Sequence, residues 1–158
     1  AGKAASTAKI LARDIKRLTK GYDFAVIDGA PQITDLAAAA VKVADLVVIP
    51  STPSPYDLWA CSDLVEIIKT RQEITDGKPK AAFLVTMSIK NTNLSKEVED
   101  ALDGYELMTL KARTTRSVAY AETAKTGGSV IDLGESHPLS IEVKEISKEI
   151  QGLLNEQD

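Results

Sequence analysis

Hydrophobic residues along the chain follow two different spacings. Four short, nearly unbroken apolar runs are each bounded by turn-forming or polar residues, which predicts strands at 23–28, 45–50, 81–87 and 106–110. Elsewhere apolar residues recur every three or four positions, which predicts helices at 4–20, 33–43, 58–73, 93–102, 117–125 and 138–154. Residues 130–133 fit either a short strand or coil. Strands and helices therefore alternate along most of the chain.

This alternation predicts an α/β fold with a doubly wound, mostly parallel sheet and helices on both faces. Runs as apolar as 24–27 are typical of strands that are covered on both sides. The 158 residues suit a single domain over 1–158. Four strands are few for such a sheet, and the chain opens with a helix that needs a partner. We therefore expect the fold to lack an N-terminal β-loop-α unit.

Composition excludes several classes of protein. Hydrophobic residues make up 44% and charged residues 27%, which is ordinary for a globular protein. The single cysteine, Cys61, excludes an internal disulfide and a cysteine-rich metal site. No stretch approaches the roughly 20 apolar residues of a membrane span, and no signal-peptide pattern is present, so we expect a cytosolic protein. The net charge of −4 argues against a wholly basic nucleic-acid binder.

Candidate chemistry begins where the first predicted strand ends. Asp28 follows the apolar run 24–27, and Gly29 and Pro31 prevent the strand from continuing. Open α/β sheets bind ligands at the carboxyl ends of their strands, and an acid there commonly holds Mg²⁺ beside a nucleotide phosphate. The alternative is that Asp28 only turns the chain before the next helix.

A stiff loop and a basic segment are two further candidates. Three prolines within residues 50–55 fix the backbone, and Asp57 is well placed to be the N-cap of the following helix. Lys111, Arg113 and Arg116 place three positive charges within six residues. They form either a solvated polar loop or a contact with a phosphate backbone.

Three stretches taken together resemble one protein family. They are YDFAVIDGAP at 22–31, ADLVVIPSTPSPYD at 44–57 and RSVAYAETAKTGGSV at 116–130. In this order and spacing they resemble the ParA-type partition ATPases, which are deviant-Walker P-loop proteins that segregate plasmids and chromosomes. The small plasmid-encoded members, which pair with a ribbon-helix-helix centromere binder, are most similar. The resemblance runs from about residue 21 to the end of the chain.

The resemblance implies a role for each matching residue. Asp28 matches the Walker B aspartate, which acts on Mg²⁺ and on the attacking water, so it is the implied catalytic and metal-binding residue. Arg116 matches an arginine in the segment that contacts nonspecific DNA, and Lys111 and Arg113 lie in the same segment. The residues implied to lie near ATP or ADP, in the proline-rich loop and at a strand tip, are Thr52, Pro53, Asp57, Thr86 and Met87.

The chain departs from the family pattern in its first motifs. The P-loop of Lys-Gly-Gly-x-Gly-Lys-Thr type is absent, because Gly2-Lys3 is followed by Ala4. The aspartate-proline-glutamine motif that should follow is absent as well. A phosphate cradle depends on the backbone amides, lysine and hydroxyl of that loop. We therefore expect a Mg²⁺-dependent ATPase in the intact protein, and no ATP hydrolysis by these 158 residues alone.

The implied function is ATP-dependent DNA partition. ATP would drive dimerisation and nonspecific DNA binding, and a centromere-binding adaptor of the ParB or ribbon-helix-helix type would stimulate hydrolysis. The protein would then be cytoplasmic and associated with the nucleoid, without a membrane contact.

Two other functions remain open. Asp28, Thr86 and Lys111 have the chemistry of a receiver-type phosphoacceptor, although the acidic pair from a first strand is missing. The other alternative is a non-catalytic DNA-binding or interaction module with the same fold.

Overall fold

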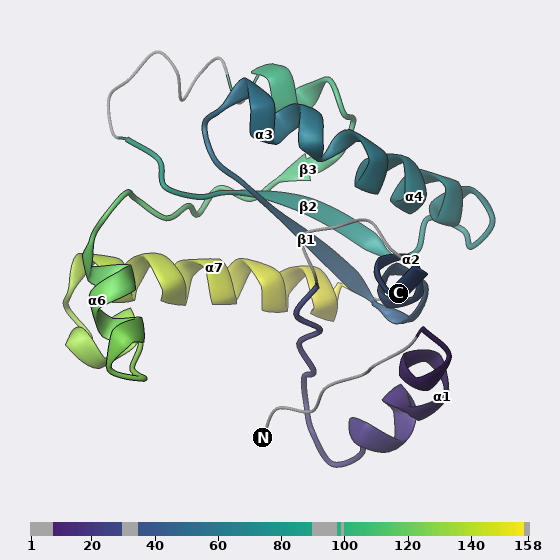
Figure 1. Cartoon of the computed structure of the whole chain (residues 1–158), viewed down its shortest axis with the longest axis horizontal. Helices are drawn as coiled ribbons and strands as arrows, with labels where there is room; N and C mark the ends of the chain where they lie inside the picture. The colour runs from purple at the N-terminus through teal and green to yellow at the C-terminus, as the bar shows by residue number, and fades with distance from the viewer. Residues whose placement is uncertain (1–7, 30–34, 90–97, 99, 157–158) are drawn as a thin grey trace. The chain divides into compact units, whose positions relative to one another are not determined.

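The computed structural model describes residues 8–29, 35–89, 98 and 100–156, and Figure 1 shows the whole chain. The regular elements, in chain order, are α1 (Ala8–Leu18), α2 (Asp35–Val43), β1 (Leu46–Ser51), α3 (Pro55–Ala60), α4 (Ser62–Glu73), β2 (Lys80–Val85), β3 (Met108–Thr109), α6 (Ala119–Lys125), the 3₁₀ helix η1 (Val130–Leu133) and α7 (Pro138–Asn155). Residues 98 and 100–103 are also helical.

The three described strands form one sheet in the order β1-β2-β3. β2 and β3 run parallel, with Ala82 opposite Met108 and Phe83 opposite Thr109. A parallel bridge between Ser88 and Thr115 continues this pairing beyond the strands. The predicted α/β class with a parallel sheet is therefore confirmed, and it is consistent with a P-loop NTPase-like fold.

The chain divides into two compact units. The first comprises Ala1–Val47 and Asp63–Lys80, and the second comprises Val48–Ser62 and Ala81–Asp158. The single domain predicted over 1–158 stays a prediction. In the first unit α1 packs against α2, with Leu11 and Val41 buried.

The core of the second unit lies on both faces of β2. Because successive strand residues point to opposite faces, Ala82 and Leu84 face α7, where they pack with Ile146 and Ile150. Figure 1 shows α7 along one side of the strands and α3 on the other. On the opposite face the buried ring of Phe83 lies 5.6 Å from that of Tyr105. β2 is thus covered on both faces, the environment that the sequence predicted for the run 24–27.

Two glutamates of α7 hold the chain that continues from β3. Glu149 accepts hydrogen bonds from the backbone N–H groups of Lys111 (2.8 Å) and Ala112 (2.7 Å). Glu142 accepts from the backbone N–H (2.9 Å) and the hydroxyl (2.8 Å) of Thr115. Side chains of a helix thus supply the acceptors that a further strand would supply along this edge.

The strand predicted at 23–28 is wrong for this structure. Residues 24–29 have no regular secondary structure, and 94% of Val26 and 52% of Phe24 are exposed. A strand requires a neighbour that pairs with its N–H and C=O groups, and none of the described residues pairs with this run. The apolar composition alone therefore does not produce a strand here.

Two smaller predictions also need correction. Residues 130–133 form a 3₁₀ helix rather than a strand or coil, because Ser129 and Asp132 cap each other's backbone N–H groups. The helix predicted over 58–73 is two helices, α3 and α4, which are separated at Cys61. Of the helix predicted at 93–102, residues 93–97 and 99 lie outside the described residues.

Candidate functional site

The ends of β1 and β2 meet through direct hydrogen bonds. The backbone N–H of Thr86 donates to the carbonyl oxygen of Ser51 at 2.8 Å, and the Thr86 hydroxyl approaches the same oxygen at 3.3 Å. Ser51 is buried at the end of its strand. The structure thus brings Thr86 to Ser51 at the start of the proline loop, a residue 35 positions earlier in the sequence.

A side-chain hydrogen bond closes the proline loop. The Thr52 hydroxyl donates to the carboxylate of Asp57, and the Ser54 N–H donates to the Thr52 carbonyl at 2.7 Å. The predicted N-cap role of Asp57 is wrong, because Ser54 is the N-cap of α3 and Pro55 follows at its first turn. Asp57 lies within that turn, where the helix dipole favours a carboxylate. Thr52, Pro53 and Asp57 are therefore held in one stiff loop.

The chain leaves β2 through a left-handed residue. Met87 has φ of 53°, is exposed, and donates its N–H to the Thr114 hydroxyl at 3.1 Å. Ser88 then bonds through its N–H and its hydroxyl to the Thr114 carbonyl, and its own carbonyl accepts from the N–H of Arg116 at 3.0 Å. These bonds tie the end of β2 to the basic segment 111–116.

Sequence reasoning missed the linking residues, Ser88 and Thr114. Both are ordinary polar residues; Ser88 directly follows the apolar run 81–87, whereas Thr114 lies four residues beyond Leu110 and carries no such signal. Ser88 is buried despite its hydroxyl, because both of its polar groups find a partner in the Thr114 carbonyl. The contact joins positions 26 residues apart, which the pattern of neither segment predicts.

Hydrogen bonds to two glutamates of α7 hold the backbone of the basic segment 111–116. Lys111 and Arg116 are exposed and Arg113 is half-buried. Glu142, which binds Thr115, also accepts a hydrogen bond from the Tyr120 hydroxyl at 3.2 Å. Burial, followed by the charge and hydrogen bond of Glu142, raises the pKa of Tyr120 to about 12.

Asp28 belongs to the other compact unit. It is exposed within the irregular residues 24–29. Over the described residues, no three or more histidine, cysteine, aspartate or glutamate side chains gather as a metal site. A lone carboxylate nevertheless fits the way Mg²⁺ usually binds, with one or two protein carboxylates and the remaining positions filled by phosphate and water. The role of Asp28 in metal binding and catalysis stays a prediction.

The thiol of Cys61 does not belong to this chemistry. It is half-buried and approaches the Asp57 carbonyl at 3.1 Å. Burial, followed by the nearby charge of Asp57, raises the pKa of the Cys61 thiol, so the thiolate is disfavoured.

Comparison with known proteins decides the family. The model of a family described as "AAA domain" matches residues 2–81, just over half of the chain. This chain belongs to that AAA-domain family. Curated relatives of the ParA family confirm the resemblance to ParA-type proteins drawn from the three sequence stretches.

Three such relatives are informative. The ParA family proteins of Mycoplasma pneumoniae and Mycoplasma genitalium are each 30% identical to this chain over 92% of its length and 56% of theirs. The "Maintenance of carboxysome distribution protein A" of Halothiobacillus neapolitanus is 25% identical over 91% of this chain and 64% of its own length. The chain thus spans about 56–64% of the curated relatives that it matches. Among the helices that are described, none has the length and apolarity needed to cross a bilayer.

Proposed function

We propose that this ParA-type protein is an ATP-dependent partition protein for DNA. In the proposed cycle ATP and Mg²⁺ favour a dimer that binds DNA nonspecifically. A centromere-binding adaptor of the ParB or ribbon-helix-helix type then stimulates hydrolysis and release. The observation that supports this most is the meeting of the proline loop and Thr86 at adjacent strand ends, where α/β folds bind their ligands.

The residues of the second unit divide into two proposed roles. Thr52, Pro53, Asp57, Thr86 and Met87 form the surface at the strand ends that receives the nucleotide. Lys111, Arg113 and Arg116 contact the DNA backbone, with an affinity that falls steeply with salt. Asp28, on the first unit, holds Mg²⁺ and orients the attacking water. Bound Mg²⁺ supplies positive charge against the phosphates.

The bonds of Ser88 support a coupling between the two roles. Because Ser88 joins the end of β2 to Thr114 and Arg116, a nucleotide that orders Met87 also orders the basic segment. A ligand shifts such an equilibrium only by its difference in affinity for the two states. ATP is therefore proposed to bind most tightly when Arg116 is positioned for DNA. The DNA-bound protein would then be located on the nucleoid in the cytoplasm.

A second candidate function concerns the cargo. One relative, matched over 91% of this chain, is named for maintaining the distribution of carboxysomes. The same ATP-driven switch would then position a carboxysome-like body rather than a plasmid. Deletion of the gene separates the two, since partition predicts loss of a low-copy plasmid and the alternative predicts a misplaced cellular body with normal plasmid retention.

The test of the ATPase assignment is turnover by the full-length protein with Mg²⁺ and DNA. Asp28→Ala is expected to lower the rate about 100-fold or more, because it removes the residue proposed to act on metal and water. Asp23→Ala is the matched control, since Asp23 is exposed in the same unit, and it should leave the rate within about twofold. No ATP turnover by the wild-type protein would remove the ATPase assignment, and full turnover by the Asp28→Ala variant would remove the role of Asp28.

Two further measurements separate the remaining alternatives. A receiver-type protein would be labelled by acetyl phosphate and would lose the label in Asp28→Asn. A non-catalytic module would bind DNA in a salt-dependent way that ignores ATP.

A further inference from the structure

The second unit has an apolar groove that the proposed ATP switch does not use. It lies between α3 and the helical residues 100–103, and its volume is about 340 Å³. This is at the lower end for ligand pockets and suits a few side chains better than an extended cofactor. Residues that line it include Leu58, Trp59, Val98, Ala101, Gly104 and Tyr105.

Contacts within the second unit hold the wall of the groove. The Tyr105 hydroxyl donates to the Leu58 carbonyl at 2.7 Å, which joins the two sides of the groove directly. The Tyr105 ring also packs on the buried Phe83 of β2. Both contacts lie within one compact unit, so the shape of the groove is set by the core beneath it.

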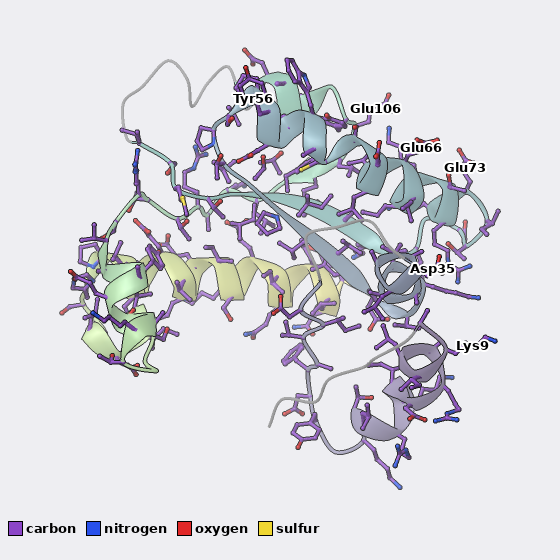
Figure 2. All side chains as sticks on the ribbon, viewed as in Figure 1. Lys9, Asp35, Tyr56, Glu66, Glu73 and Glu106 are labelled. Atoms are coloured by element: carbon purple, nitrogen blue, oxygen red, sulfur yellow. The ribbon has the colours of Figure 1, made fainter. Side chains whose placement is uncertain are left out.

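Two large aromatic side chains are exposed on the α3 side. Trp59 is 67% exposed and lines the groove, and Tyr56 is 77% exposed. Their rings meet edge to face, with centroids 5.6 Å apart at 82°. Figure 2 shows Tyr56 projecting on the α3 side of the sheet, away from α7. Exposed aromatic residues beside an apolar pocket are typical of protein interfaces, where they act as anchors.

The charges around the groove indicate the chemistry of its occupant. Asp57, Asp100 and Asp103 each directly precede a residue that lines the groove, namely Leu58, Ala101 and Gly104. Among the described residues of 54–62 and 98–105 there is no lysine or arginine. The exposed Asp100 and Asp103 therefore favour a positively charged partner over nucleic acid.

We propose that the groove docks a basic amphipathic peptide segment of a partner protein. A leucine or aromatic side chain of that segment fills the apolar pocket beside Trp59, and its lysines and arginines lie against Asp100 and Asp103. This goes beyond the proposed function, because the site requires neither ATP nor DNA. Peptide binding can therefore fail while ATP turnover is retained, and the reverse holds as well.

The chain carries its own reporter for this test. Trp59 is the only tryptophan of these 158 residues, and the difference between the wild-type emission and that of Trp59→Phe isolates its signal. The probe is a synthetic helical peptide with leucine and phenylalanine on one face and lysine and arginine on the other, titrated into the full-length protein. We expect the Trp59 emission to move to shorter wavelength and the affinity to weaken with salt. A matched peptide with glutamate in place of lysine and arginine should bind at least about tenfold more weakly.

Two variants locate the contact, with binding followed by the anisotropy of a fluorescein-labelled basic peptide. Trp59→Ala should weaken binding about tenfold or more, while Val118→Ala, which truncates an exposed residue outside the groove, should not change it. Asp100→Lys combined with Asp103→Lys should weaken it similarly, while Glu145→Lys on α7 should have little effect. Circular dichroism of each variant checks that the fold is retained.

Three results would overturn the proposal. One is equal binding of the basic and acidic peptides, and another is a loss in the control variants as large as that in the groove variants. The third is a Trp59 shift on concentrating the protein alone, with a doubling of mass by light scattering that Trp59→Ala abolishes. That outcome would make the groove an interface between two copies of this chain.

Discussion

Two apolar runs of similar composition adopt different structures in this protein, one a buried strand and the other an exposed irregular segment. Residues 24–27 read Phe-Ala-Val-Ile and residues 82–85 read Ala-Phe-Leu-Val. The second run lies in β2 and its phenylalanine, Phe83, is completely buried. The first run is irregular, and half of the surface of Phe24 is exposed. The difference therefore does not arise from the residues themselves.

The difference arises from the neighbours of each run. β2 lies between β1 and β3, and its carbonyl groups accept from Leu110 (2.9 Å) and Thr114 (3.2 Å). α7 covers one of its faces and Tyr105 packs on the other. Residues 24–29 have no such pairing with any described residue. A hydrophobic run becomes a strand only where other segments satisfy its backbone and cover its side chains.

The largest expected effect compares the only two phenylalanines of the chain. Phe83→Ala should lower the free energy of unfolding by about 3–5 kcal/mol, because it leaves a cavity in a closely packed core. Phe24→Ala should cost less than about 1 kcal/mol, because much of this side chain is already in water. Urea denaturation of both variants measures the two costs. Equal costs would mean that residues 24–27 pack in a core in solution.

The next effect concerns the acceptors that α7 supplies. Glu149→Ala should lower the free energy of unfolding by about 1–3 kcal/mol, because the N–H groups of Lys111 and Ala112 lose a charged acceptor. Glu145→Ala, an exposed glutamate on the same helix, should change it by no more than about 0.5 kcal/mol. Indistinguishable midpoints in urea would show that water replaces Glu149 without cost. In that case water can satisfy the backbone N–H groups beside β3, as it can for the exposed residues 24–29, whereas β2 depends on protein partners.

The smallest effect is a pH dependence at the same edge. The folded-state pKa of Tyr120, about 12, lies above the ordinary value of about 10. Folding therefore favours the protonated phenol, so this stabilisation is present below about pH 10 and is lost as the pH rises towards 12. The phenolate absorbance of the wild-type protein minus that of Tyr120→Phe should titrate near pH 12. A difference curve centred near pH 10 would contradict the contact with Glu142.

Much of the fold follows from local patterns. β1, β2 and α7 lie within a few residues of their predicted positions, because a short apolar run or a regular helical spacing marks each of them. Competing local signals account for two errors. Pro55 prefers the first turn of α3, which makes Ser54 rather than Asp57 the N-cap. Ser129 and Asp132 have the spacing of a capping box, which favours a helical turn over a strand.

The candidate site was predictable only in its separate pieces. The proline loop and the end of β2 could each be found from a strand followed by turn-forming or polar residues. Their junction depends on Ser51 and Thr86, and the link to the basic segment depends on Ser88 and Thr114. These pairs are distant in sequence, so only the sheet pairing brings them together. Whether Asp28 joins them stays a prediction.

The spacing of the two glutamates on α7 has a mechanical consequence. Glu142 and Glu149 are seven residues apart, a rise of about 10.5 Å along a helix. Three residues of extended chain, such as those from Ala112 to Thr115, span about 10 Å. The spacing of the two glutamates therefore matches the spacing of the two backbone groups that they bind. If α7 slipped by one turn, both anchor points would be lost together. We therefore expect a displacement of Arg116 to be transmitted to α7, and a spin label near Asn155 should detect it.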